Sequence, residues 1–428
     1  MPRRLSLANS LLFIIFLTMV SALALANPAQ DLFTDYKKSI YQIRVIELSS
    51  GKKTSIGSGF QVSANGLIAT NFHVISEAVH KPEKYRLEYI NHEGQKGSLS
   101  IKNIDVIHDL ALVRHRDNFP EFIRLSARPL NKGEAIYSMG NPLDLGMIIL
   151  QGSYSGLLEN SFYERILFSG SLNPGMSGGP TLDNRGKVIG INVATAGNQI
   201  SFLVPVKYLQ ALLENPDQQH DTAALISLIN LQLHLDQSAK LDVLLKSPWP
   251  KDALGSTTII GEIAKFTRCW GDTNDDADKL YSVTWSRCSS SDSIYISNSF
   301  NTGKIDYEFY LFSTKTLNPL RFFARYQNAF GPIYSANTAY KEDVTNFQCQ
   351  QDYVGNGITE QKTNNSAWNT LFCARAYKNY PGLYDVLFIN AYLGESDQGL
   401  ITHFSLTGVS RKNSLAFLKR FMEQIQWN

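Results

Sequence analysis

The sequence predicts a mainly β protein with a helical segment near its middle. From residue 31 to about residue 206, short apolar or alternating runs are separated by turns rich in Gly, Asn and Asp. Short strands at this spacing are typical of a sandwich or a barrel. The apolar residues then change to helical spacing, and beyond about residue 256 strand patterns rich in aromatic residues return. These observations divide the chain into a β region, a helical region and a second β region.

Composition limits the classes to which the protein can belong. Of the 428 residues, 43% are hydrophobic and 18% are charged, which excludes a wholly disordered, collagen-like or coiled-coil chain. The length suits two or three domains. The formal net charge is +2, from 40 Lys and Arg against 38 Asp and Glu. A balance so close to neutral argues against a dedicated nucleic-acid partner.

The individual elements follow from local patterns. The first region is expected to hold strands that include 39–48, 57–62, 67–70, 110–114 and 187–193. A short helix over 206–214 precedes a longer one over 222–245, whose apolar positions are Leu225, Ile226, Ile229, Leu233 and Leu235.

The C-terminal part of the chain begins after an expected linker, Ser247-Pro248-Trp249-Pro250. Its clearest strands cover 304–313 and 383–393. An amphipathic helix from about Asn413 to Trp427 ends the chain, with Leu415, Leu418, Met422 and Ile425 expected on its buried face.

Residues 1–26 have the pattern of a secretory signal peptide. Arg3 and Arg4 precede the apolar run 11–20, and the small residues Ala24 and Ala26 mark a cleavage site. The alternative is an uncleaved membrane anchor, but the run is short for a spanning helix. We therefore expect cleavage after Ala26, no stable membrane insertion afterwards, and export into a periplasm or out of the cell.

All four cysteines lie in the C-terminal 160 residues. In an oxidising compartment four cysteines suggest two disulfides, and three pairings exist. Local pairing of Cys269 with Cys288 and of Cys349 with Cys373 closes short loops around strand-turn-strand units, so we predict these two bonds. The alternatives are four buried free thiols or a zinc site, but no CxxC spacing supports zinc.

Three polar residues in the first region are candidates for nucleophilic catalysis. Ser177 lies in the run Asn173 to Pro180 (NPGMSGGP), whose glycines let backbone N–H groups approach a substrate carbonyl. His73 follows a strand, and Asp109 opens the strand pattern DLALVR. Taken singly, these residues also fit a glycine-rich turn, a surface histidine and a strand cap. His108 and Asp105 are nearby competitors, although the sequence context favours Asp109.

The order and context of these motifs resemble those of trypsin-like serine proteases of the HtrA (Do-like) type. GSGFQVSANGLIATNFHVI resembles that family's histidine motif, DLALVR its aspartate motif and NPGMSGGP its serine motif. MGNPLDLGMIILQGSYSGL and ISFLVPV resemble strands beside its active site. The resemblance covers about residues 39–209 and implies a chymotrypsin-like double β-barrel. The patterns beyond residue 209 predict a helical linker and a β-rich (α+β) accessory domain that resembles no recognised family. The expected domains are a signal peptide over 1–26, a protease domain over 31–210, a helical segment and linker over 211–255 and an accessory domain of unknown function over 256–428.

The resemblance implies that His73, Asp109 and Ser177 form a catalytic triad. It also implies an oxyanion hole in the loop of Gly175, Met176 and Ser177, with the N–H groups of Gly175 and Ser177 as donors. Such a mechanism requires no metal and no organic cofactor. The expected substrates are proteins or peptides, and the accessory domain either recognises substrate or mediates assembly into a homo-oligomer.

The sequence departs from the family pattern in three places. Met176 stands where HtrA relatives usually have Asn, and Val193 stands where relatives often have a hydroxyl directed at the catalytic Asp. No PDZ-like sequence follows residue 209, although the family usually continues into such a domain. Support for Asp109 is therefore expected to be weaker than in relatives.

The residues expected to line the first substrate pocket carry no charge: Ser171, Leu172, Val193, Ala194 and Thr195. A small or medium aliphatic side chain of the substrate fits this lining better than Lys or Arg. The leading hypothesis is an exported serine endopeptidase. The alternatives are an inactive binding protein or chaperone on a protease fold, and a different acyl-transfer hydrolase.

Overall fold

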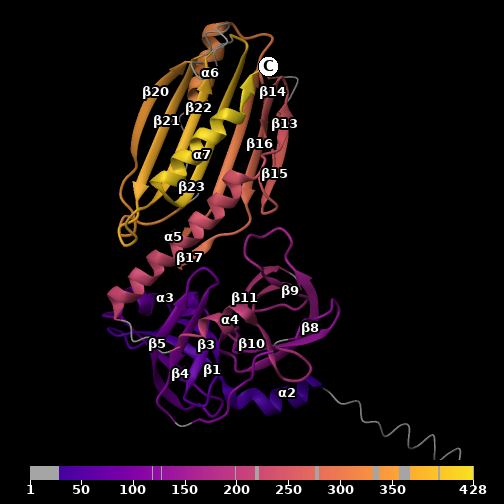
Figure 1. Ribbon diagram of the computed structural model, residues 1–428, viewed down its shortest axis with the longest axis vertical. Helices are drawn as coiled ribbons and strands as arrows, with labels where there is room; N and C mark the ends of the chain where they lie inside the picture. Colours follow the sequence, from indigo (N-terminus) through magenta and orange to yellow (C-terminus); the bar gives the residue numbers. More distant parts are fainter. Residues whose placement is uncertain are drawn as a thin grey trace, which may run out of the picture.

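The computed structural model describes residues 28–427 except 118, 127, 198, 217–220, 275–278, 331–336, 356–366 and 394–395. The predicted signal peptide lies outside the described residues. The chain forms two bodies, a pair of barrels and a large twisted sheet, which one long helix joins (Figure 1). Within the described residues, no helix is long and apolar enough to cross a membrane.

The first body consists of two closed antiparallel barrels of six strands each, which confirms the predicted double-barrel fold. The first barrel has the order β1-β2-β3-β6-β5-β4, with β1 Ile40–Glu47, β2 Lys53–Gln61, β3 Leu67–Thr70, β4 Tyr85–Ile90, β5 Lys96–Asp105 and β6 Leu110–Arg114. The second has the order β10-β11-β12-β9-β8-β7, with β7 Ala135–Gly140, β8 Ile148–Leu157, β9 Ile166–Phe168, β10 Pro180–Leu182, β11 Val188–Gly197 and β12 Ile200–Pro205.

Short helices accompany the barrels. Helix α2 (Pro28–Tyr36) and the 3-10 turn η1 (Lys37–Ser39) precede the first strand, and α3 (Phe72–His80) follows β3. The turn η2 (Pro142–Asp144) follows β7, and α4 (Val206–Leu212) follows β12, the last strand of the second barrel.

The two barrels share one apolar core. Phe60 and Leu112 of the first barrel belong to the same buried cluster as Met139, Ile191 and Val204 of the second. Because close-packed side chains tolerate little displacement, this shared core fixes the position of one barrel against the other. The relative position of the two barrels is therefore set by this core.

Helix α5 (Thr222–Lys246) connects the barrels to the sheet (Figure 1). The Asp221 side chain caps its first turn by accepting a hydrogen bond from Ala224 N at 2.8 Å. Ile229 and Leu233 are buried beside the first barrel, whereas Leu244, further along the helix, is buried against the sheet. The predicted helix is confirmed, but the expected apolar position Leu235 is 63% exposed, because the helix changes partners along its length.

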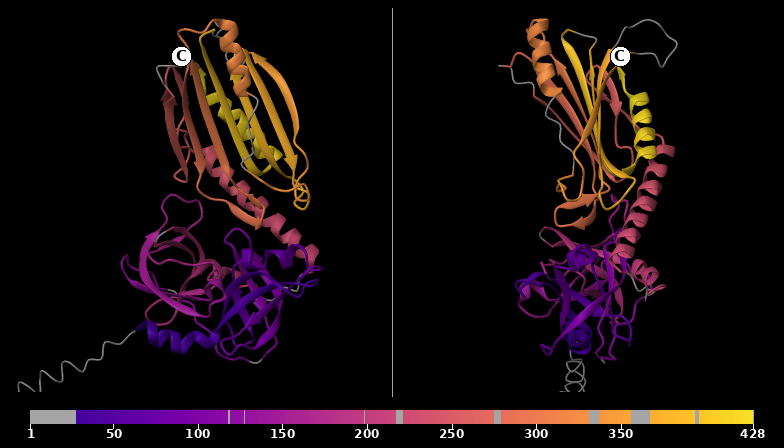
Figure 2. Two further views of the ribbon diagram at one scale, coloured as in Figure 1. Left: turned by 180° about the vertical axis from the view of Figure 1, so that it is seen from behind. Right: turned by 90° about the vertical axis from the view of Figure 1, so that its left-hand side faces the viewer.

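The second body is built on a seven-stranded antiparallel sheet of order β15-β16-β19-β23-β22-β21-β20. Its strands are β15 Thr267–Asn274, β16 Ser282–Ser290, β19 Ile305–Ser313, β20 Gln348–Gly355, β21 Ala367–Ala376, β22 Leu383–Tyr392 and β23 Gln398–Ser410. Helix α7 (Arg411–Gln424) covers one face and α6 (Pro319–Phe330) packs on the other (Figure 2). Beside the sheet lie the small sheet of β13 Lys251–Leu254, β14 Thr257–Ile260 and β24 Gln426–Trp427, and the hairpin of β17 Ile294–Ser297 and β18 Phe300–Thr302.

Two sequence interpretations in this body need correction, the linker and the buried face of the last helix. The expected linker is packed, since Trp249 is buried, donates from Nε1 to the Leu244 carbonyl at 2.9 Å and contacts the Phe417 ring. Strands resume at Lys251 rather than near residue 256. Of the face predicted for α7, Leu418 and Met422 pack against the core and Ile425 is buried in it, but Leu415 is 45% exposed. The most deeply buried apolar side chains of the helix are Phe417 and Phe421. Aromatic rings bury more apolar surface than the aliphatic side chains on which the prediction relied.

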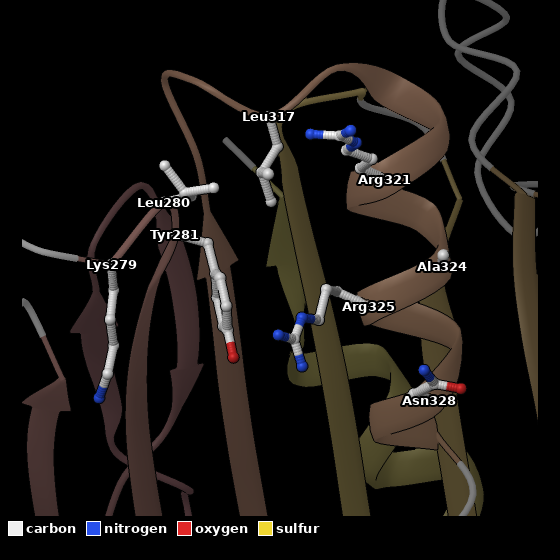
Figure 3. Close-up of a pocket in the computed structure, with 8 residues that line it drawn as sticks. All are labelled: Lys279, Leu280, Tyr281, Leu317, Arg321, Ala324, Arg325 and Asn328. Carbon is white, nitrogen blue, oxygen red and sulfur yellow. The ribbon is translucent and has the colours of Figure 1, made fainter.

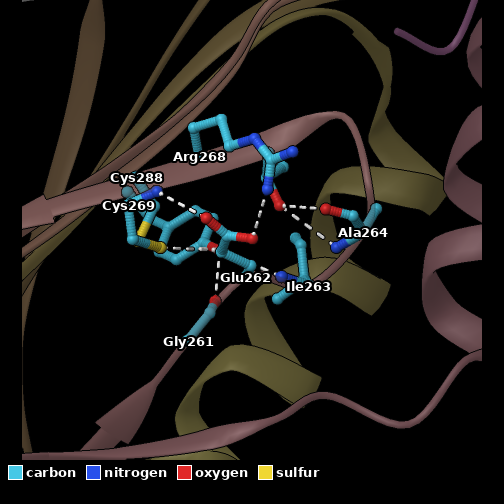
Figure 4. The surroundings of a disulfide bond; sticks show 9 residues. Gly261, Glu262, Ile263, Ala264, Arg268, Cys269 and Cys288 are labelled. Atoms are coloured by element: carbon cyan, nitrogen blue, oxygen red, sulfur yellow. Dashed lines mark hydrogen bonds and ion pairs between the residues drawn. A yellow bond between two sulfur atoms is a disulfide. The ribbon is translucent and has the colours of Figure 1, made fainter. Parts of the chain in front are cut away.

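Both predicted disulfides are present. Cys269 bonds to Cys288 and Cys349 bonds to Cys373, and in each pair the two residues lie directly opposite on neighbouring strands. Beside the first bond, Glu262 accepts hydrogen bonds from Cys269 N at 3.2 Å and from the Arg268 guanidinium at 2.9 Å (Figure 4). Each bond thus ties an edge strand of the sheet to its only neighbour.

A surface pocket of about 580 Å³ lies at the end of the sheet far from the barrels, between α6 and the β15–β16 connection (Figure 3). The Arg325 guanidinium lies 5.4 Å from the centre of the Tyr281 ring at this pocket. The pocket is remote from the first body and from the candidate catalytic residues.

Replacing Cys349 and Cys373 together with alanine should lower the free energy of unfolding of the second body, the sheet domain, by about 3 kcal/mol. The bond closes a loop with a sequence separation of 24, and removing it restores chain entropy to the unfolded state. Urea unfolding followed by tryptophan fluorescence measures the change. The matched control replaces Asp352 and Thr370, which face each other in the same two strands without a covalent link. An equal loss in both double variants would contradict the prediction.

Candidate active site

His73 and Asp109 are brought together by the turn of one helix and one tight loop. His73 lies in the first turn of α3, directly after β3, and Asp109 ends the connection between β5 and β6. Asp109 has a φ of 60°, a left-handed conformation that Asp tolerates better than most residues. Asn71 Nδ2 donates to the Asp109 carbonyl at 2.8 Å and holds this conformation.

The Asp109 carboxylate contacts His73 twice. Oδ2 lies 2.6 Å from His73 Nδ1, and Oδ1 accepts a hydrogen bond from His73 N at 2.8 Å. The first contact fixes the ring so that Nδ1 carries the proton and Nε2 points away as a free base. The arrangement matches the prediction that these two residues pair.

The electrostatics of His73 reflect a balance of opposing effects. Burial lowers the pKa of the His73 imidazole, while the charge of Asp109 and its hydrogen bond raise it. The net result is a pKa above the ordinary value of 6.5. Asp109 therefore stabilises the protonated ring, as a base that accepts a proton from a hydroxyl requires.

Ser177 lies in a loop that two tight glycine positions shape. Gly175 has a φ of 96° and Gly178 a φ of 83°, and a side chain at either position would collide with neighbouring backbone. Ser58 of the first barrel secures this loop, because its N–H donates to the Ser177 carbonyl and its hydroxyl donates to the Gly175 carbonyl, both at 2.7 Å. The Ser177 loop is thereby attached to the first barrel.

Asn192 supports the same loop from below. Its side chain is fully buried and donates from Nδ2 to the carbonyls of Met139 and Met176 at 3.0 and 3.1 Å. The backbone carbonyl of Asn192 accepts the Gly178 N–H at 2.9 Å. Sequence reasoning missed both Asn192 and Ser58 as supporting residues, although Ser58 stands in the GSGF string of the histidine motif.

The predicted oxyanion hole requires free backbone donors. Within the described part of the chain, neither the Gly175 N–H nor the Ser177 N–H donates to a protein acceptor. Met176 differs, since its N–H donates to the Asn173 carbonyl at 3.0 Å and its side chain is fully buried in the core of the second barrel. Met176 therefore shapes the loop without offering an N–H to an oxyanion, because that N–H is occupied and the side chain fills the core of the second barrel.

The Ser177 hydroxyl is not bonded to His73 in this structure. Ser177 Oγ donates to the Val193 carbonyl at 3.1 Å, and no hydrogen bond joins it to His73 among the described residues. The Val193 side chain, which replaces the hydroxyl common in relatives, packs against the core shared by the barrels. The structure thus assembles the His-Asp pair and the loop, with the serine hydroxyl turned toward the second barrel.

The predicted pocket residues lie in the same barrel as Ser177. Ser171 is exposed and its hydroxyl accepts the Gln199 N–H at 3.1 Å, whereas Leu172 is buried in the barrel core. The backbone of Ala194 and Thr195 belongs to β11, but their side chains lie outside the described part.

The competing pair lies apart from Ser177. His108 Nδ1 is 2.7 Å from Asp105 Oδ2, and the His108 ring stacks on Tyr208 at 3.7 Å. These two residues therefore form their own contact next to α4, and Asp109 is the carboxylate that faces His73.

Comparison with known proteins concerns the barrels. Residues 57–191 match the model of the trypsin-like peptidase domain. The mitochondrial serine protease HTRA2 of Drosophila erecta is 31% identical over 169 residues, which are 37% of this chain and 39% of that protein. Serine protease HTRA1A of Danio rerio is 31% identical over 194 residues, or 43% of this chain and 38% of that protein.

The chain spans about two fifths of the length of the curated relatives that it matches. A crystal structure of the serine endoprotease from Yersinia pestis aligns with a TM-score of 0.38 at 23% identity, over 44% of this chain and 65% of that chain. His73, Asp109 and Ser177 all lie within the matched residues. Residues 57–191 thus match the trypsin-like peptidase domain, and the barrel region is similar to the HTRA2 and HTRA1A serine proteases.

Proposed function

We propose that this protein is a serine endopeptidase that hydrolyses peptide bonds in unfolded or exposed protein segments. The observation that carries the proposal is the His73–Asp109 pair at 2.6 Å, in the same domain as the glycine-shaped loop of Ser177. The N–H groups of Gly175 and Ser177 in this loop have no protein acceptor among the described residues. A serine hydroxyl is a weak nucleophile, so its reaction with a carbonyl requires such a base.

The proposed reaction begins when the Ser177 hydroxyl turns from the Val193 carbonyl to His73 Nε2. Ser177 Oγ attacks the substrate carbonyl carbon as its proton passes to His73, and Asp109 stabilises the imidazolium. The N–H groups of Gly175 and Ser177 bind the negative oxygen of the tetrahedral intermediate. His73 then gives its proton to the leaving amine, and water releases the acyl group by the same route.

The orientation of Ser177 favours a second candidate function. A hydroxyl bonded to Val193 O rather than to His73 is also what an inactive binding protein or chaperone on a protease fold would have. A labelled fluorophosphonate separates the two functions, because only a serine activated by its base reacts rapidly with this probe.

We also propose that the protein is exported. The pattern of residues 1–26 supports this proposal, and so do two disulfides in the sheet domain, since disulfides persist in oxidising compartments. Secreted protein from the native cell should begin at Asn27 when its N-terminus is sequenced, and an intact Met1 would contradict cleavage.

Ser177→Ala should abolish both casein hydrolysis and fluorophosphonate labelling, while thermal unfolding stays within about 2 °C of the wild type. Loss of a triad member typically costs several orders of magnitude in rate, and Ser177 contributes no apolar packing to a core. The matched control is Ser155→Ala, which removes an exposed hydroxyl from β8 of the same barrel. Casein hydrolysis by Ser177→Ala at the wild-type rate would contradict the endopeptidase proposal.

The pH profile should depend on the His73–Asp109 contact. His73 must be neutral to accept a proton, so kcat/KM should fall as the pH drops through a pKa that lies above 6.5. In Asp109→Asn the carboxylate charge no longer raises the pKa of His73, whereas burial still lowers it. The acid limb of the profile should therefore move to lower pH. The rate should also fall by roughly four orders of magnitude. Peptide hydrolysis measured from about pH 5 to about pH 9 tests this, and an unmoved limb would contradict it.

Cleavage should favour Val, Ala or Leu before the scissile bond. Ser171, Leu172 and Val193 carry no charge, so a Lys or Arg side chain would lose its hydration without gaining a counter-charge. We expect kcat/KM for matched peptides with Lys at this position to be lower by at least about tenfold. Mass spectrometry of products from a peptide library gives the profile. Products that end mainly in Lys or Arg would contradict the prediction.

A further inference from the structure

The hairpin of β17 and β18 extends from the sheet domain onto the helix that carries His73. The Tyr295 ring of this hairpin lies edge-to-face against the His73 imidazole, with ring centres 5.8 Å apart and planes at 70°. This geometry is one that aromatic pairs prefer. A side chain more than 200 positions away in sequence thus contacts the candidate base directly.

Polar contacts hold Tyr295 in this place. Its hydroxyl lies 3.4 Å from Ser76 Oγ on α3 and donates to Asn298 Oδ1 at 2.8 Å. Asn298 Nδ2 in turn donates to Glu77 Oε1 at 3.2 Å, and Thr54 Oγ1 of β2 donates to the other oxygen of the same carboxylate at 2.9 Å. The tip of the hairpin is therefore hydrogen-bonded to the first barrel through α3.

Apolar packing reinforces these contacts. Ile294 and Ile296 alternate with Tyr295 along β17, and both are buried in one cluster with Ile75 and Val79 of α3. Alternate residues of a strand point to opposite faces. The two isoleucines therefore extend from one face of β17, and the Tyr295 ring extends from the other face to contact His73. The hairpin is a packed component of the first body rather than a loose neighbour.

The residues just before the hairpin attach to the second barrel. Asp292 accepts hydrogen bonds from Ser161 Oγ and Phe162 N, both at 2.6 Å. Ser291 Oγ donates to the Asn160 carbonyl at 2.6 Å. One continuous segment of the sheet domain, residues 290–302, therefore contacts the barrel of His73 and also the barrel of Ser177.

We propose that Tyr295 is a positioning residue for His73, so that the sheet domain supplies part of the active site. The proposal rests on the proposed endopeptidase function. Asp109 holds one edge of the imidazole through Nδ1, and Tyr295 restricts the ring from another side. Catalysis depends on the orientation of this ring, because a displacement of about 1 Å at a reacting group can cost a hundredfold in rate.

The first experiment compares Tyr295→Phe and Tyr295→Ala in the full chain. Tyr295→Ala should lower kcat for a peptide about tenfold, equal to about 1.4 kcal/mol, and should leave KM within about twofold. The labelling rate with a small fluorophosphonate should fall by the same factor, because this probe depends on His73 but not on distant substrate contacts. Tyr295→Phe keeps the ring and should retain at least about half of both rates.

The matched control is Tyr353→Ala in the same domain, where the side chain is 66% exposed and distant from His73. It should change neither rate. If Tyr295→Ala lowers kcat/KM for peptides but leaves fluorophosphonate labelling unchanged, Tyr295 contacts only substrate and the positioning proposal is overturned. Equal losses in Tyr295→Phe and Tyr295→Ala would overturn it as well, since the ring would then have no role.

A second measurement does not depend on activity. In ¹⁵N-histidine-labelled Ser177→Ala protein, the proton on His73 Nδ1, which is hydrogen-bonded to Asp109, should give a resolved resonance, assigned by its absence in His73→Ala. Adding Tyr295→Ala should broaden this resonance through exchange with water, while adding Tyr353→Ala should not. An unchanged resonance overturns the proposal. If the wild-type protein fails to react with fluorophosphonate, the endopeptidase function fails, and this resonance still decides whether Tyr295 positions the ring.

Discussion

Helix α3, which carries His73, is buried on two sides at once, and the relation between fold and site depends on this packing. One side packs into the first barrel, and the other meets Ile229 of α5 and Ile296 of the hairpin in a single apolar cluster. His80 at the end of the same helix also lies 2.8 Å from the Tyr380 hydroxyl of the sheet domain. Because both sides are close-packed, the helix has little freedom to move by itself. The position of the candidate base therefore depends on both bodies of the molecule.

The Ser177 loop depends on a different kind of interaction, a buried polar network. Asn192 and Ser58 are inaccessible to water, and both use their side chains to bond backbone carbonyls of the loop or of its neighbours. A buried polar group without partners would cost more than about 1 kcal/mol, so such groups specify one arrangement when they are satisfied. This network leaves the Gly175 and Ser177 N–H groups without protein acceptors in the described part of the chain, which is the feature that an oxyanion hole needs.

Disulfide bonds at the edges of the sheet and an aromatic core beneath α7 stabilise the sheet domain. The two disulfides join edge strands to their neighbours. The Phe421 ring of α7 stacks on Phe309 and meets Phe404 edge-to-face, which joins the helix to the sheet. Rigidity matters here because the domain places residues 290–302 on both barrels. Helix α5 and residues 290–302 attach the sheet domain to both barrels. We therefore expect the sheet domain and the barrels to move together.

The sequence by itself predicted the short strands, the long helix and the disulfide pairs from local signals, namely turn glycines, strand alternation and short loops. The double barrel and the roles of His73, Asp109 and Ser177 were implied by the resemblance of its motifs to those of HtrA-type proteases. Only the tertiary structure decided that Trp249 is buried rather than part of a linker, that Phe417 faces the sheet, and that Tyr295 meets His73. These facts depend on which surfaces pack together, and a pattern of neighbouring residues does not encode contacts between segments 200 positions apart.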